Sequence, residues 1–372
     1  MKKYVLLLLC LYFFPQNAFA EERPLLTVDG LKSWTITFSE ALDDTTLNEQ
    51  TIYIETVTQQ KHPVSISLQA EHIVIVEPLQ PYTSSEPYTL VIQDVKSRSQ
   101  KSLVEISRQP FTVSNHPTTA TWIWNAYDLN LAYVDFLIKQ RTEKVFVQVD
   151  YDLPMSAYVP FFEKLQQHNI KIYALEGIVG KHWFDQPYYE QRYFNWVETF
   201  QQQYGYFDGI HIDAEPYISP TWHTAQQQVL QQYFNFLQRA RTFADDAQLR
   251  FEVDMPFWFD LITYRNSFGS GNVAQFIIDL TDEVTIMAYR NSANAIIDVA
   301  KEEYTYAHQQ QKDITIAIET LPSDEGNFLS FYDQPYTFLP SIYAVHEAFD
   351  STIAIHYLQA WMSYTQNKKA KA

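Results

Sequence analysis

Between residues 115 and 372, short apolar segments alternate with longer segments of helical spacing, and this alternation constrains the fold more than any other feature. Eight strand–helix units over about 250 residues predict an α/β fold, a (β/α)8 TIM barrel. The last helix is expected to be short or missing. An open doubly wound sheet is an alternative, although no glycine-rich phosphate loop follows the first strand. The predicted strands are TWIWNAY, KVFVQVDYD, IKIYALEG, FDGIHIDAE, LRFEVDMP, EVTIMAYR, DITIAIET and TIAIHYLQAW.

Residues 21–114 follow a different pattern of short alternating strands with turn signals and no helix, which predicts a small all-β sandwich. The segment TITFSEALDDTTLNEQTIYI resembles the opening of the bacterial Ig-like domains found in surface-layer and other exported proteins. That resemblance implies a spacer or adhesive module without catalytic residues. The polar stretch SNHPTTA, 114–120, separates the two parts, so we expect each to fold independently.

The first twenty residues, MKKYVLLLLCLYFFPQNAFA, combine a basic start, an apolar run and small residues at the end. This pattern is typical of a cleavable signal peptide, and it predicts cleavage after Ala20 and a secreted, periplasmic or cell-envelope location. The single cysteine, Cys10, lies within it. The mature protein is therefore expected to use neither disulfides nor thiolate chemistry.

Charge and composition narrow the range of partners. Loss of Lys2 and Lys3 with the signal takes the formal charge from −18 to −20, which argues against nucleic acid. No later apolar run is long enough to span a bilayer. Aromatic residues make up 16% of the chain, and many follow predicted strands, where their rings suit stacking on sugars as well as core packing. Nothing in the sequence indicates an oligomeric state.

The run FDGIHIDAEPY, residues 207–217, contains candidate catalytic residues, because it places several acids in an otherwise apolar strand. Alternate side chains of a strand face opposite sides, so His211, Asp213 and Glu215 share one face. The other face is apolar: Ile210, Ile212 and Ala214. Two carboxylates two residues apart have Cα atoms about 7 Å apart, so both can serve one substrate.

Other strand ends also carry polar or aromatic side chains, and barrel enzymes build their sites from these ends. An acid there can also cap a helix or pair with an arginine. In strand seven, three isoleucines form the outward face, so Glu319 is expected to point inward. The strand-end residues are Asp150, Asp152, Glu176, Glu252, Asp254, Met287, Tyr289, Glu319, Tyr357 and Trp361.

The run DGIHIDAE, 208–215, resembles the strand-four signature DGxDxDxE of glycoside hydrolase family 18, the chitinase-like enzymes. IMAYR resembles the Met-x-Tyr motif of that family, and Trp361 stands where it often has a tryptophan on strand eight. The resemblance implies that Glu215 is the general acid and base and that Asp213 orients and stabilises a substrate N-acetyl group. It also implies that Tyr289 hydrogen-bonds to that group, in a substrate-assisted mechanism.

Three positions depart from the family pattern. His211 replaces its first inner aspartate, Arg290 follows Tyr289 where an aspartate is common, and ALEG replaces its Ser-x-Gly-Gly motif. We interpret His211 as a hydrogen-bonded interior residue. No spacing among the acids and histidines matches a metal-ligand pattern, so neither a metal nor another cofactor is expected.

Two further interpretations remain open. Glu215 before Pro216 on strand four and Glu319 on strand seven resemble the acid/base and nucleophile of retaining barrel glycosidases, although Ala214 stands where that group has asparagine. The second interpretation is a barrel that binds glycan without cleaving it. We predict an exported hydrolase of a polysaccharide that contains N-acetylated sugars. The catalytic candidates are Asp213, Glu215, Tyr289 and Glu319. The substrate-binding candidates are Asp150, Glu176, His211, Asp254, Tyr357 and Trp361.

Overall fold

The computed structural model describes residues 9–11, 25–28, 30, 32–79, 82, 87–113, 117–177 and 186–369. The chain divides into two compact units, Met1–His116 and Pro117–Ala372. The predicted signal, residues 1–20, lies outside the described residues except for the short strand β1, which pairs in parallel with β3. Cleavage after Ala20 stays a prediction.

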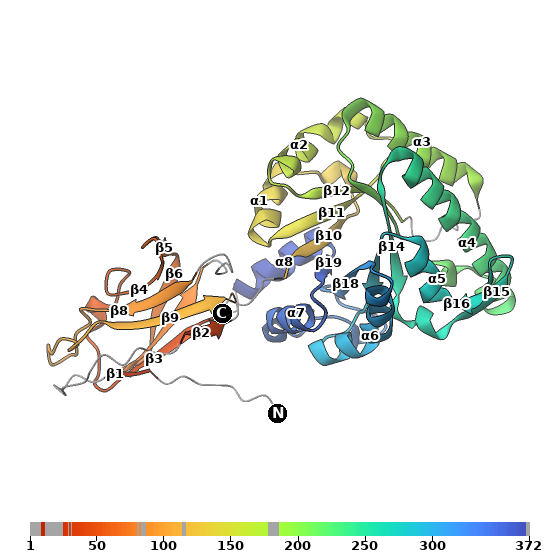
Figure 1. The fold of residues 1–372 in the computed structure, drawn as a ribbon. Helices are drawn as coiled ribbons and strands as arrows, with labels where there is room; N and C mark the ends of the chain where they lie inside the picture. The colour runs from red at the N-terminus through yellow and green to blue at the C-terminus, as the bar shows by residue number, and fades with distance from the viewer. Residues whose placement is uncertain are drawn as a thin grey trace. The chain divides into compact units, whose positions relative to one another are not determined.

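The first unit consists of two facing β-sheets, as predicted for the Ig-like sandwich (Figure 1). Trp34 and Ile36 from one sheet and Leu90 and Phe111 from the other share one buried core. The Trp34 and Phe111 rings are 4.9 Å apart. The first sheet runs β1 (Leu9–Leu11), β3 (Trp34–Phe38), β7 (Ile73–Pro78) and β6 (Val64–Ala70). The second runs β2 (Leu26–Val28), β9 (Ser107–Val113), β8 (Tyr88–Ile92), β4 (Ile52–Thr56) and β5 (Lys61–His62).

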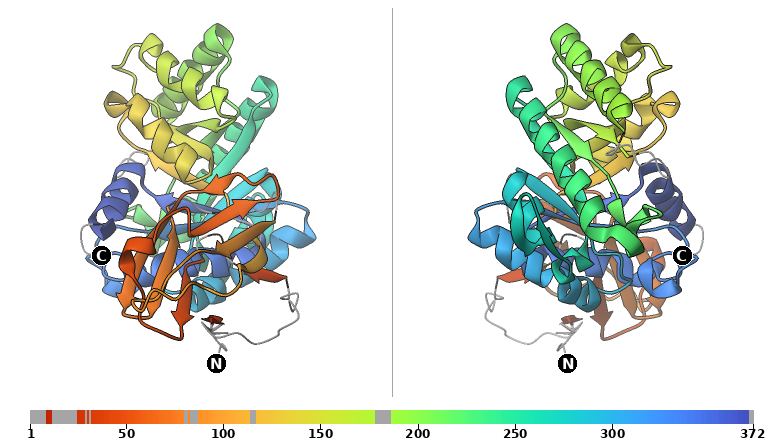
Figure 2. Two further views of the ribbon diagram at one scale, coloured as in Figure 1. Left: turned by 90° about the vertical axis from the view of Figure 1, so that its left-hand side faces the viewer. Right: turned by 90° about the vertical axis from the view of Figure 1, so that its right-hand side faces the viewer.

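The second unit is a closed barrel of parallel strands surrounded by helices (Figures 1 and 2). The first and last strands pair in parallel, with Thr119 opposite Ile353, and this pairing closes the ring. The predicted (β/α)8 barrel is confirmed, and the open-sheet alternative is wrong. In barrel order the strands are β10 (Thr119–Ile123), β11 (Thr142–Gln148), β12 (Lys171–Glu176), β13 (Gly209–Ile212), β14 (Arg250–Pro256), β17 (Glu283–Met287), β18 (Asp313–Glu319) and β19 (Thr352–His356).

The helices begin and end at residues whose chemistry favours those boundaries. Asn130 caps α1 by accepting the Ala132 N–H. The helix α3 begins at Pro187 and is capped after Tyr204 by Gly205, which has a left-handed φ of 69°. The hairpin of β15 (Thr263–Asn266) and β16 (Gly269–Asn272) precedes α5. The helices are α1 (Leu131–Lys139), α2 (Val159–Gln167), α3 (Pro187–Tyr204), α4 (Trp222–Ala247), α5 (Val273–Leu280), α6 (Ala293–Gln309), α7 (Pro335–Phe349) and α8 (Leu358–Lys369).

The end of the chain differs from the prediction. β19 ends at His356, and the residues from Leu358 onward form α8, a helix of 12 residues. Trp361 therefore lies in a helix, where its buried ring packs against Phe136 of α1. The placement of Trp361 on strand eight was wrong, because the apolar residues after His356 fit a helical period as well as a strand.

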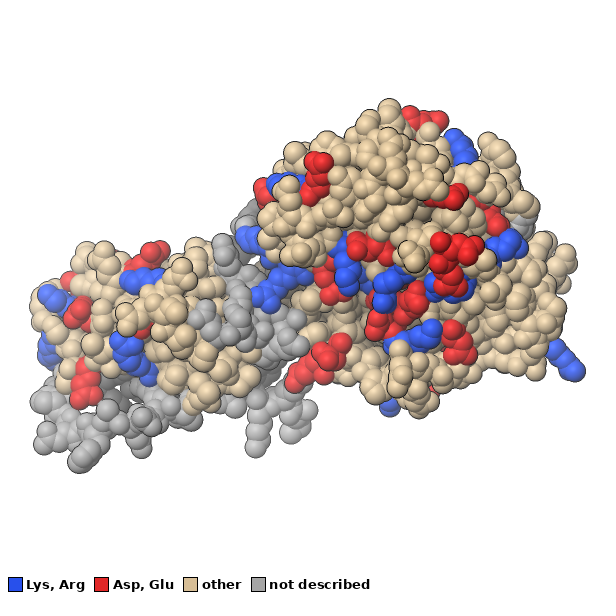
Figure 3. Space-filling view, turned by 45° about the horizontal axis from the view of Figure 1, so that its top comes forward, with Lys and Arg blue, Asp and Glu red and all other residues tan. Residues whose placement is uncertain are grey.

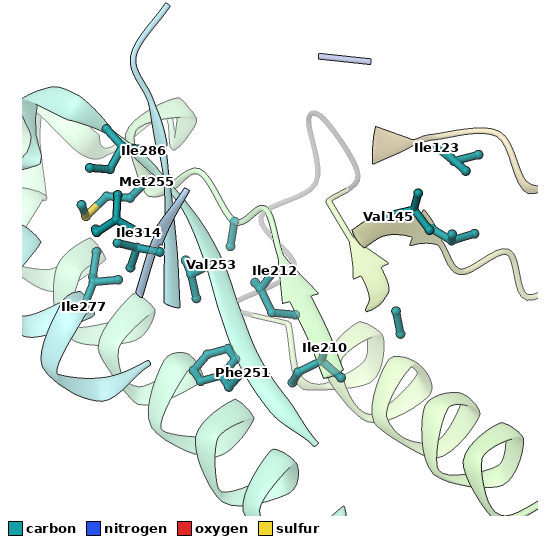
Figure 4. Close-up of a cluster of buried hydrophobic side chains, with 14 of the residues drawn as sticks. Ile123, Val145, Ile210, Ile212, Phe251, Val253, Met255, Ile277, Ile286 and Ile314 are labelled. Carbon is teal, nitrogen blue, oxygen red and sulfur yellow. The ribbon is translucent and has the colours of Figure 1, made fainter. Parts of the chain in front are cut away.

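Alternate side chains of each barrel strand face the surrounding helices and form a continuous apolar layer. Figure 4 shows part of it, with Ile210 and Ile212 of β13, Phe251 and Val253 of β14 and Ile277 of α5. The inward residues form a separate cluster that includes Trp122, Phe146, Tyr173 and Leu175. This division follows from the two-residue period of a strand and decides which side chains reach the barrel interior.

Acidic and basic side chains are interspersed on the face of the barrel unit seen in Figure 3. The view shows no large area of a single sign on that face. Among the described helices, none is both long enough and apolar enough to cross a bilayer.

Candidate active site

The strand β13 presents polar side chains to the barrel interior and apolar ones to the helices, as its alternation predicted. The His211 ring is buried inside the barrel and stacks on Phe146, with ring centroids 3.7 Å apart. Asp213 and Glu215 follow directly after the strand, at the carboxyl end of the barrel. The outward side chains Ile210, Ile212 and Ala214 are all buried in the outer apolar layer.

The two residues that begin this run have structural roles. A Cβ atom on Gly209 would lie 2.4 Å from the ring of Tyr173, so only glycine fits there without displacing that ring. The Asp208 carboxylate accepts the backbone N–H of Ile172 at 2.8 Å, which ties β12 to β13. The DG pair therefore holds the strand in register, and the residues after it supply the chemistry.

Asp213 lies beside a second carboxylate, Asp254, on the neighbouring strand. Ile212 pairs with Val253, so the next residues along these strands, Asp213 and Asp254, face the same side. One oxygen of each carboxylate, Oδ1, is buried and has no hydrogen-bond partner among the described residues. Burial, and then the charges of Asp254 and Glu215, raise the pKa of Asp213 well above its usual range. The cause is that like charges in one buried site do not both ionise readily.

One hydrogen bond and one ion pair hold Asp254 from the barrel interior. Trp122 donates its indole N–H to Oδ2 of Asp254 at 3.0 Å, and Nε2 of His211 lies 2.9 Å from the same oxygen. Burial alone would lower the pKa of His211, but the carboxylates of Asp254 and Glu252 raise it above its ordinary value. The raised pKa favours the protonated form of His211, which lies beside Asp254 inside the barrel, as its interpretation as an interior residue predicted.

The charges continue down the barrel axis from His211. Nζ of Lys144 lies 3.0 Å from Glu252 and 2.6 Å from Glu283, and Lys144 and Glu252 are almost fully buried. Nδ1 of His211 lies 3.6 Å from Glu252. Burial works against the charge on Lys144, but its two carboxylate neighbours raise its pKa overall. We call this set the charge column: Glu283, Lys144, Glu252, His211 and Asp254.

Glu215 has the environment of a general acid. Its carboxylate is partly buried, and it accepts a hydrogen bond from the hydroxyl of Tyr217. Burial raises the pKa of Glu215, and the charge of Asp254 adds to this effect, while Tyr217 and His356 oppose it. The result is a carboxyl group that keeps its proton to a higher pH than a solvent-exposed glutamate does.

Glu319 points inward, as its parity predicted, but both of its oxygens are occupied. Oε1 accepts the backbone N–H groups of Thr320 at 2.6 Å and Leu321 at 2.7 Å. Oε2 lies 2.7 Å from Nδ1 of His356. Trp124 donates its indole N–H to the other ring nitrogen of His356 at 3.1 Å, so the proton of a neutral His356 lies on Nδ1 and is donated to Glu319. This arrangement orients His356 towards the site.

Two predicted aromatic residues also lie at the barrel mouth. Tyr289 and Tyr357 pack against the inner cluster, with ring centroids 6.1 Å and 5.3 Å from that of His356. Burial, followed by the nearby carboxylates of Glu319, Asp254 and Asp213, raises the pKa of Tyr289 well above its usual value. Tyr289 is therefore a neutral hydrogen-bond donor in reach of the acidic centre.

Other candidates lie apart from this centre. Glu176 has the outward parity of β12 and is buried, and Tyr151 donates to it at 2.5 Å. Asp150 accepts the Asp152 N–H at 2.9 Å in the loop after β11, at the rim of the mouth. Trp361 packs outside the barrel, as described above. The structure thus brings Asp213, Glu215, His211, Asp254, Tyr289, Glu319 and Tyr357 together.

Five of the residues that complete the site were not singled out from the sequence. His356 shares its inward parity with Ala354, while Ile353 and Ile355 face outward, so the same alternation rule identifies it. Tyr217 stands two residues after Glu215 in the motif itself. Trp122 and Trp124 come from the first strand, where nothing local indicates a partner on β14 or β19. A Cβ atom on Gly177 would lie 2.7 Å from Cβ of Asp213, so a glycine there leaves room for the acid.

The class of protein can now be stated: a (β/α)8 barrel with a carboxylate-lined mouth, preceded by an Ig-like domain. Residues 26–113 match the family model described as "Bacterial Ig-like domain". A comparison of the sequence with curated proteins found no match.

Among solved structures, the barrel is similar to several glycoside hydrolases. A chitinase from Chromobacterium violaceum has 14% identity and a TM-score of 0.36, over 55% of this chain and 69% of the other. A family 18 chitinase from Pseudoalteromonas aurantia has 9% identity and a TM-score of 0.44, over 66% and 99%. An exo-beta-1,4-mannosidase from an Opitutaceae bacterium has 11% identity and a TM-score of 0.45, over 65% and 52%. At such identities the similarity concerns the fold alone, and the chemistry has to come from the residues of the site.

Proposed function

We propose that the barrel is a glycoside hydrolase that cleaves a polymer of N-acetylated sugars, with Glu215 as general acid and base. The observation that carries this proposal is the pairing of Glu215, whose pKa is raised, with Asp213, whose pKa is raised further, at the carboxyl end of the barrel. Cleavage of a glycosidic bond needs a carboxyl group that still holds its proton at the working pH. Burial, with the nearby charge of Asp254, gives Glu215 that property.

The proposed reaction uses the N-acetyl group of the substrate as the nucleophile. Glu215 gives its proton to the glycosidic oxygen as the bond to the anomeric carbon breaks, and the acetamido carbonyl oxygen bonds to that carbon. Asp213 holds the acetamido N–H, on which positive charge develops, and the Tyr289 hydroxyl donates to the acetamido oxygen. Glu215 then takes a proton from the water that opens the cyclic intermediate.

The contacts of Glu319 support substrate assistance over a retaining mechanism with a protein nucleophile. A nucleophilic carboxylate must turn a free oxygen towards the anomeric carbon. Two backbone N–H groups and the His356 ring occupy the oxygens of Glu319. In the proposed reaction Glu319 is therefore a positioning residue that orients His356.

The test is the Glu215→Gln variant in a hydrolysis screen of glycans and peptidoglycan. An amide keeps the shape of the side chain but delivers no proton, so turnover should fall about 100- to 10,000-fold with the fold unchanged. Glu163→Gln, at an exposed carboxylate on α2, is the matched control and should keep full activity. Unchanged turnover in Glu215→Gln would refute the assignment. If neither form releases reducing ends yet both bind glycan equally, the barrel is a binding module.

We also propose that the enzyme works outside the cytoplasm. The signal-like start of the chain and its Ig-like domain, a module typical of exported bacterial proteins, support this location. Mass spectrometry of the protein recovered from its producing cells should find a chain that begins at Glu21. Recovery of the full-length chain from the cytoplasm would contradict the proposal.

A further inference from the structure

An arginine at the mouth of the barrel has no carboxylate partner among the described residues. Arg290 follows β17 at the carboxyl end of the barrel, directly after Tyr289, and its side chain is partly exposed. It is also one of the positions at which the chain departs from the chitinase-like pattern. The described arginines that form ion pairs are Arg98, Arg108, Arg239, Arg241 and Arg250.

Two aromatic rings and one hydrogen bond fix the guanidinium of Arg290. It lies 4.5 Å from the ring centroid of Phe257, after β14, and 5.7 Å from that of Phe328, after β18. Its Nη1 donates to the backbone carbonyl of Tyr289 at 2.7 Å. A guanidinium carries more N–H donors than this bond uses, and stacking on rings leaves its edge free. The remaining donors are therefore available to a ligand.

The backbone around Arg290 is tied to the next loop of the barrel. Asn291 donates its backbone N–H to the Phe328 carbonyl at 3.0 Å and its side-chain amide to the Asn327 carbonyl at 3.0 Å. Gly326 has a φ of 141°, and a Cβ atom there would lie 2.5 Å from the Phe328 ring, so glycine leaves room for that ring. A donor group that is fixed before the ligand arrives loses less freedom on binding.

The ring that holds Arg290 from one side belongs to the same wall of the mouth as the proposed catalytic acid. Trp258, the residue after Phe257, packs against Tyr217 with ring centroids 5.1 Å apart. Tyr217 donates its hydroxyl to Glu215. A substituent of a sugar bound at Glu215 and directed towards this wall therefore meets the guanidinium of Arg290.

The charges of the mouth indicate which kind of substituent that is. Asp213, Glu215 and Asp254 lie at the same end of the barrel as Arg290. Such a group of acids repels an anionic ligand unless a fixed cation offsets the repulsion. A neutral sugar needs no such cation, whereas a carboxylate forms charge-assisted and often bidentate hydrogen bonds with a guanidinium. The chemistry of Arg290 thus matches a carboxylate.

We propose that Arg290 selects a glycan whose sugars carry carboxylate groups and that its guanidinium binds one of these groups at the mouth. This inference rests on the proposed function and adds the class of substrate, an acidic polymer of N-acetylated sugars in place of a neutral one. Such carboxylates come from lactyl ethers or from uronic acids, and the experiment separates the two sources.

The experiment measures binding without turnover. The Glu215→Gln variant is titrated by calorimetry with three tetrasaccharides: N-acetylglucosamine alone, N-acetylglucosamine alternating with N-acetylmuramic acid, and N-acetylglucosamine alternating with glucuronic acid. Arg290→Gln, added to that variant, should weaken binding of one acidic tetrasaccharide about ten- to one-hundred-fold, the value of a hydrogen bond to a charged group. Binding of the neutral tetrasaccharide should not change.

Two further variants separate charge from shape. Arg290→Lys keeps the charge and should retain part of the affinity for the acidic tetrasaccharide, and this affinity should fall as salt is added. Arg141→Gln makes the same change at the opposite end of the barrel, directly before β11, and is the control that should alter none of the affinities.

The acidic tetrasaccharide whose binding depends on Arg290 identifies the source of the carboxylate. An equal effect of Arg290→Gln on all three probes would show a purely structural role and overturn the inference, and so would a parent that binds neither acidic probe. Hydrolysis by the unmodified protein is measured separately. Binding that depends on Arg290 without hydrolysis would leave the recognition standing and remove the proposed function. Hydrolysis of the neutral probe with no effect of Arg290→Gln on any affinity would do the reverse.

Discussion

Replacement of Lys144 by methionine would test the charge column, because methionine keeps the length of the side chain but removes its charge. Lys144 is 1% exposed and holds Glu252, which is fully buried, and Glu283. After the substitution Glu252 keeps the hydroxyl of Tyr173, His211 at 3.6 Å and Arg250 at 3.9 Å, but it loses the ammonium group that balances its charge at 3.0 Å. Breaking one side of a buried ion pair leaves an uncompensated charge and costs about 3–5 kcal/mol. For a domain of this size that corresponds to a fall in melting temperature of roughly 6–20 °C.

Scanning calorimetry of the full chain at neutral pH would measure this change. Lys164→Met is the matched control, because Lys164 pairs with Asp135 at 2.9 Å on the surface and its loss should cost at most about 1 kcal/mol. Adding Glu252→Gln to Lys144→Met should recover part of the loss, since it removes the stranded charge. Equal melting temperatures for the Lys144 and Lys164 variants would refute the view that these charges hold the barrel interior together.

Three further outcomes are expected. Tyr217→Phe removes a hydrogen bond that lowers the pKa of Glu215, so the alkaline limb of the kcat/KM profile should move to higher pH, and an unmoved limb would contradict the role of Glu215 as the acid. Asp213→Asn should reduce turnover far more than Glu319→Gln, whereas azide rescue of Glu319→Gly on sugars without N-acetyl groups would reverse that ranking. Glu303 is buried with both oxygens unpartnered among the described residues, and burial raises its pKa to about 8. The folded protein thus keeps a proton on Glu303 that the unfolded chain loses near pH 4.5, so the free energy of unfolding falls as the pH rises from 4.5 to about 8. Glu303→Gln should therefore raise the melting temperature at pH 9 but not at pH 4.

Much of the fold and part of the site follow from local pattern. The two-residue period of strands is a property of the chain itself, so it predicted that Asp213, Glu215 and Glu319 share the inner side of their strands. The alternation of strand and helix patterns is also a property of the local sequence, and it predicted the barrel. Local pattern gave the wrong prediction where one sequence fits two structures. The apolar run after His356 was predicted to continue the strand, but it forms α8, which contains Trp361.

The partners of these residues were decided by barrel closure. Asp254 accepts a hydrogen bond from Trp122, which lies 132 positions earlier in the chain. Glu319 contacts His356 because β18 and β19 are neighbouring strands in the barrel. Whether a carboxylate is a free nucleophile or is held by three donors depends on such contacts, and no local period encodes them. The sequence by itself therefore determined which acids point inward. The tertiary structure decided which of them keeps a proton, because protonation depends on burial and on charges supplied by distant strands.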